Sequence, residues 1–103
     1  MSARRWLHDH LSDAPPGLLE AMSSAVPDEG GAPEGLATGA VSLFERVLRG
    51  SGGREDALAL LAADALLTHA LEAQAALDPD GLPAFAARWG GGGRLGALAE
   101  RGG

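Results

Sequence analysis

The chain has 103 residues, 46% of them hydrophobic, which predicts one folded domain with a modest core and argues against disorder. Its formal net charge of −6 disfavours binding to nucleic acid or to anionic membranes, because both of these partners are negatively charged. Cysteine is absent, which excludes disulfides, thiolate nucleophiles and cysteine-containing metal sites.

Two helices are predicted in the first quarter of the chain. In "SARRWLHDHL", Ser2 can cap a short helix on which Trp6, Leu7 and Leu11 share one side. In "DAPPGLLEAMSSAV", Asp13 is the expected N-cap and prolines occupy the opening positions. The apolar face of this second helix comprises Leu18, Leu19, Met22 and Val26.

The clearest amphipathic pattern runs from Pro33 to Arg49. Glu45 and Arg49 form an i,i+4 pair on its polar side, together with Thr38 and Ser42, and Gly50 is a plausible stop. The residues expected to face inward are Leu36, Ala37, Ala40, Val41, Phe44, Val47 and Leu48. We therefore expect one face of this helix to lie on the core.

A long helix is predicted over residues 54–77, after the "GSGG" turn. Its leucines point in nearly every direction, which is typical of a helix surrounded by neighbours, so we expect it to be the central buried element. Asp64, Thr68 and Glu72 recur every fourth residue and form the expected solvated strip. The stretch "DPDGLPAFAARWG" then predicts a turn and a further helix that buries Leu82, Phe85, Ala86 and Trp89.

The last segment, "GGGGRLGALAERGG" at residues 90–103, predicts a glycine-rich hinge and a short tail. Its small residues and leucines after a flexible linker resemble the C-terminal cargo-loading peptides of encapsulin nanocompartments, and such a tail would dock on another protein. The resemblance is confined to this tail. The favoured alternative is that Leu95 and Leu98 fold back onto the core of the same chain.

The fold class that follows is all-α. The few β-branched residues are isolated within helical patterns, so no strand is predicted. We expect a small bundle of about five helices around the central helix at about 54–77. Residues 1–89 would form a single helical domain, followed by the hinge and tail at 90–103.

His69 is the most informative single residue. It lies nearer to the apolar side of its helix than to the polar strip, so it is expected to be shielded from water. A packed histidine, bonded to a backbone carbonyl or at a subunit contact, is favoured over a ligand or proton carrier. The candidate ligand-binding set is His69, Asp64, Thr68 and Glu72.

Other motifs are weaker than they first look. His8 and His10 diverge on a helix and cannot readily chelate one ion, and "DPDG" lacks the later ligands of a calcium loop. No set of residues meets the needs of a catalytic site. We therefore expect no catalytic residues, no metal site and no cofactor.

The function predicted is a non-enzymatic helical interaction or scaffolding domain whose partner is a protein, with self-association as a homodimer. The alternative is a small-molecule or metal-binding bundle that uses His69 and its polar neighbours. The candidate interface residues are Trp6, Phe44, Trp89, Leu95 and Leu98. The start "MSARRWLHDHL" has no apolar segment and the 57–77 run is interrupted by charges, so we expect a cytoplasmic location without membrane insertion.

Overall fold

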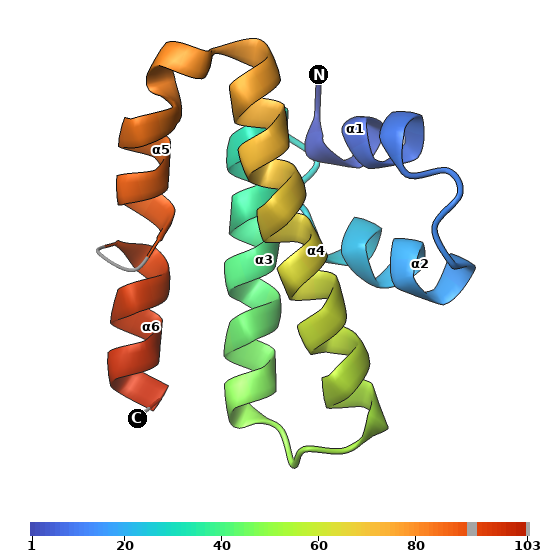
Figure 1. Cartoon of the computed structure of the whole chain (residues 1–103). Helices are drawn as coiled ribbons and strands as arrows, with labels where there is room; N and C mark the ends of the chain where they lie inside the picture. The colour runs from blue at the N-terminus through green and yellow to red at the C-terminus, as the bar shows by residue number, and fades with distance from the viewer. Residues whose placement is uncertain (91–92, 103) are drawn as a thin grey trace.

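The protein is an all-α bundle, as the sequence predicts. The computed structural model describes residues 1–90 and 93–102, and no strand occurs among them (Figure 1). The predicted hinge therefore lies partly outside the described residues. The elements, in chain order, are α1 (Ala3–His10), α2 (Pro16–Ala25), α3 (Ala32–Arg49), α4 (Arg54–Leu77), the short 3₁₀ helix η1 (Pro79–Gly81), α5 (Leu82–Trp89) and α6 (Arg94–Gly102).

An antiparallel hairpin of α3 and α4 forms the middle of the molecule, with α1 and α2 on one side and α5 and α6 on the other (Figure 1). The turn between α3 and α4 passes through Gly52, whose φ of 84° lies in the left-handed region that favours glycine. Small side chains dominate the face that α4 buries, and they allow a close approach to α3. The buried residues of α4 are Ala59, Ala62, Ala63, Leu66, Ala70 and Ala73.

The expectation that α4 is enclosed on all sides is wrong. Only a stripe rich in alanine is buried, while Leu58, Leu60, Leu61, Leu71 and Leu77 are exposed. The reason is that α4 lies on α3 with its other neighbours at its flanks, so its outer face meets water (Figure 1). On α3, Leu48 was expected to face inward and is also exposed.

Helix α1 is held against the end of α2 by an arginine. Its start is capped as predicted, because the Arg5 backbone N–H donates to Ser2 Oγ at 3.2 Å. Arg4 donates to the carbonyl of Ser23 from Nε and Nη2 at 3.4 and 3.3 Å, and to the carbonyl of Val26 at 3.4 Å. Ser23 lies in the last turn of α2 and Val26 is its C-cap residue, so the guanidinium binds acceptors that lack intrahelical partners at the end of this helix.

Asp13 does not cap α2, contrary to expectation. The helix begins at Pro16, its N-cap is Pro15, and the cap makes no side-chain hydrogen bond. Two consecutive prolines explain the shift, because a residue before proline is driven out of the helical region. Asp13 consequently lies in the turn that precedes the helix.

Two glycines allow other segments to approach α3 closely. A Cβ atom at Gly35 would lie 2.7 Å from Ala3 Cβ, and one at Gly39 would lie 2.8 Å from Val26 Cγ1 and 3.2 Å from Leu66 Cδ1. Such separations are shorter than normal van der Waals contacts. The packing of α1 and of the end of α2 therefore depends on the absence of these two side chains.

The C-terminal helices are anchored to α3. The Trp89 indole N–H donates to Glu34 Oε2 at 3.0 Å, and Arg88 forms an ion pair with Glu34. Arg88 and Trp89 both belong to α5. Their contacts with Glu34 hold α5 against the first turn of α3. Helix α6 lies beside α3, with Leu98 buried and Leu95 partly buried against the core (Figure 1).

Candidate functional site

His69 forms part of an aromatic cluster between α1 and α4. Its side chain is 22% exposed, and its Nδ1 lies 3.0 Å from Glu72 Oε2. A carboxylate accepts, so the Nδ1–H of His69 donates. The partner within the chain is thus the Glu72 carboxylate and not a backbone carbonyl, and the expected alternative of a subunit contact stays a prediction. The His69 ring lies 5.5 Å from the Trp6 ring, centroid to centroid, at an interplanar angle of 52°.

His10 completes this cluster from α1. Its ring stacks on Trp6 with centroids 4.1 Å apart and an interplanar angle of 12°. Its Nδ1–H donates to the Trp6 carbonyl at 3.0 Å. Each histidine therefore has one ring nitrogen engaged locally, and the cluster fastens α1 onto α4 through the indole of Trp6.

The four candidate ligand residues do not converge on one point. His69 and Glu72 meet, but Asp64 and Thr68 are exposed on the side of α4 that faces away from α3. In the part of the chain that the structure describes, no group of three or more His, Cys, Asp or Glu side chains is placed to hold a metal ion. Of the four candidate residues, His69 and Glu72 are therefore the pair in hydrogen-bond contact among the described residues.

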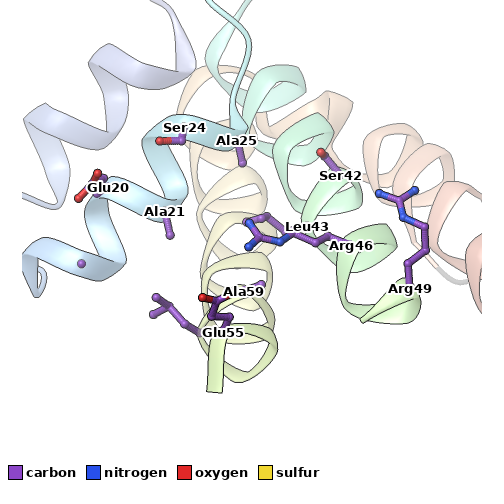
Figure 2. Close-up of a pocket in the computed structure, with 12 residues that line it drawn as sticks. Glu20, Ala21, Ser24, Ala25, Ser42, Leu43, Arg46, Arg49, Glu55 and Ala59 are labelled. Carbon is purple, nitrogen blue, oxygen red and sulfur yellow. The ribbon is translucent and has the colours of Figure 1, made fainter. Parts of the chain in front are cut away.

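A cleft of about 560 Å³ lies between α2, α3 and α4 (Figure 2). Arg46 reaches into it from α3, Glu20 lies on α2 and Glu55 on α4. Arg49, two serines, a glycine and apolar residues complete the wall. The full lining is Gly17, Glu20, Ala21, Ser24, Ala25, Ser42, Leu43, Arg46, Arg49, Glu55, Leu58 and Ala59.

The charged side chains of this cleft do not neutralise one another by direct contact. Among the described residues, the ion pairs are Arg4 with Asp28, Arg5 with Asp9, His69 with Glu72, and Arg88 with Glu34. Arg46, Arg49, Glu20 and Glu55 take part in none of them. Sequence reasoning missed this cleft because its walls come from three helices, and only the docking of α2 on the α3–α4 hairpin brings them together.

A second, apolar depression lies between α3, α4 and α6, with a volume of about 220 Å³. We call it the apolar groove. Leu48 and Leu60 lie at its rim and are 51% and 47% exposed. The residues that line it are Phe44, Val47, Leu48, Leu60, Leu95, Leu98 and Ala99. Three of the five predicted interface residues, Phe44, Leu95 and Leu98, thus lie in one groove.

The other two predicted interface residues are buried within the chain itself. Trp6 is 7% exposed and Trp89 is 8% exposed, and both belong to the hydrophobic core. Trp6 lies on α1 and Trp89 on α5, and each of these helices has 8 residues. So short a helix has few side chains that can pack on the core. A large aromatic anchor is what such a short helix needs, so these tryptophans are committed to packing.

Among the described residues, no helix is both long and apolar enough to cross a membrane. Comparisons of the chain with models of protein families, with curated proteins and with solved structures find no match.

Proposed function

We propose that the protein is a non-enzymatic helical interaction domain of the cytoplasm, and that it associates with a second copy of itself through the apolar groove. The observation that carries this proposal is the composition of the groove, in which all seven lining residues are apolar. A recess lined wholly by apolar side chains favours an apolar partner surface over water. Removing it from water gains about 25 cal/mol for each Å² of apolar area.

A second copy is the partner that the groove supports best. A two-fold interface uses the same patch on both subunits, so that patch must supply both protruding side chains and a recess for them. Leu48 and Leu60 line the groove and are about half-exposed, and Leu95 and Leu98 of α6 line it as well. The net charge of −6 argues against nucleic acid as a partner.

The alternative function, ligand binding at His69, has less support. Its proposed polar neighbours Asp64 and Thr68 are exposed and lie apart from the His69 side chain, which is already engaged by Trp6 and Glu72. A bound molecule at this place would have to displace those contacts. Self-association requires no such rearrangement.

The test compares two charged substitutions on the same helix. Leu60→Glu places a carboxylate at the rim of the apolar groove, and Leu77→Glu places one at the end of α4, where the leucine is 67% exposed and outside the groove. We expect the wild-type chain and Leu77→Glu to form dimers, and Leu60→Glu to be monomeric, in light scattering after gel filtration.

Circular dichroism checks that both variants keep the helical content of the wild type, since both leucines are exposed and neither substitution should unfold the chain. A wild-type chain that stays monomeric across the whole accessible concentration range contradicts the proposal. So does a dimer that is weakened equally by the two substitutions.

A further inference from the structure

The α2–α3–α4 cleft has the dimensions of a small-molecule site. Its volume of about 560 Å³ falls within the roughly 300–1,000 Å³ that such sites occupy in proteins. Its apolar wall is formed by Ala21, Ala25, Leu43, Leu58 and Ala59. This wall suits a compact apolar group, and it is separate from the groove to which we assign self-association.

Charged residues of both signs line this cleft; Arg46 extends into it, whereas the Arg49 guanidinium points away from α2 (Figure 2). Arg46 and Arg49 come from α3, whereas Glu20 comes from α2 and Glu55 from α4 (Figure 2). None of the four is among the ion pairs of the described residues. The guanidinium of Arg46 can bind a carboxylate through two parallel hydrogen bonds, and a carboxylate of the cleft can accept from an ammonium group.

The mixture of signs restricts the ligand. The lining holds two arginines and two glutamates, so an anionic ligand on Arg46 would be repelled by Glu55, and a cationic ligand on Glu55 would be repelled by Arg46. A molecule with both charges uses both kinds of side chain. The hydroxyls of Ser24 and Ser42 add donors and acceptors at the same wall.

We infer that the α2–α3–α4 cleft binds a small apolar zwitterion, such as an apolar α-amino acid or dipeptide. Its carboxylate lies on Arg46, its ammonium group on Glu55, and its side chain on the alanine and leucine wall. Arg49 and Glu20, at the margins of the cleft, set the surrounding potential.

Isothermal titration calorimetry with four probes tests the inference. L-leucine and L-leucyl-L-leucine carry both charges, 4-methylpentanoate carries only the carboxylate, and 3-methylbutylamine carries only the ammonium group. We expect at least one zwitterion to bind, and the tighter of the two identifies an amino acid or a dipeptide as the ligand class. Each singly charged probe should bind at least about tenfold more weakly, because it lacks one charge-assisted hydrogen bond.

Three variants locate the site. Arg46→Gln and Glu55→Gln should each weaken binding of the zwitterion by about tenfold or more. Arg54→Gln is the matched control, because Arg54 is an exposed arginine that does not line the cleft, and it should leave the affinity unchanged. All three side chains are exposed, so thermal unfolding should show unchanged stability.

Several outcomes would overturn the inference. One is the absence of binding by both zwitterions up to their solubility limits. Another is an affinity for 4-methylpentanoate equal to that for the zwitterions, which would make the cleft a simple anion site. A third is an equal loss of affinity in Arg46→Gln and Arg54→Gln, which would mean a general charge effect. None of these measurements depends on the oligomeric state. The proposed zwitterion site can therefore be refuted while the proposed self-association stands.

Discussion

Adding one methyl group to α3 should destabilise the protein, although it improves the helix propensity of the sequence. Gly35→Ala gains at most about 1 kcal/mol in propensity, because that difference between glycine and alanine applies to a helix interior and Gly35 lies in the first turn of α3. The new Cβ would lie 2.7 Å from Ala3 Cβ, so α1 must move outward by about 1 Å to restore a normal contact. Overpacking of this kind costs about 1–3 kcal/mol.

Taking about 2 kcal/mol for the overpacking, the net change is a loss of at least about 1 kcal/mol in the free energy of unfolding. For a domain of this size, that loss lowers the Tm by roughly 4–8 °C. Gly17→Ala on α2 is the control, since its Cβ would meet no atom within 4 Å. It should leave stability unchanged or increase it. Both are measured by urea unfolding followed by circular dichroism.

The rescue variant separates the clash from other effects of the substitution. Ala3→Gly removes the methyl group that Gly35→Ala would strike, so the double variant should recover part of the lost stability. If Gly35→Ala is as stable as the wild type or more stable, the close approach of α1 and α3 does not limit this position. Stability effects that simply add in the double variant would refute the same reasoning.

Three further outcomes follow from contacts and charge. Glu34→Ala should lower the free energy of unfolding by about 1 kcal/mol relative to Glu34→Gln, which keeps an acceptor for the Trp89 indole; equal urea midpoints would exclude that role. Self-association should strengthen as salt rises, because screening reduces the repulsion between copies of net charge −6, and sedimentation at two ionic strengths measures this. His69→Leu should change Trp6 fluorescence but not the oligomeric state, and loss of the dimer would move the interface to this cluster.

Local signals predicted where the helices lie. Glycine and proline mark the ends of the long helices, and the predicted range 54–77 coincides with α4. Ser2 was identifiable as a cap because a serine before a helical pattern has a specific role. Asp13 was misjudged because two prolines delayed the start of α2 beyond the reach of its side chain.

What the sequence could not predict is which side of each helix meets a neighbour. On α4 the leucines were predicted to face inward, yet the buried stripe consists of five alanines and Leu66. Arg46 and Glu55 gave no sign of sharing a cleft, since they belong to different helices and their spacing follows no motif. Phe44, Leu95 and Leu98 were selected as apolar anchors, and only the docking of α6 brings them into one groove.

The hairpin of α3 and α4 has a consequence for how the chain folds. Its helices have 18 and 24 residues, whereas α1, α2 and α5 have 8, 10 and 8. Isolated helices shorter than about 12–15 residues are marginal in water, and a short connecting turn makes closure of the hairpin inexpensive in entropy. We expect α3 and α4 to pair first, so that their amide protons exchange most slowly with solvent and the short helices condense onto a template already formed.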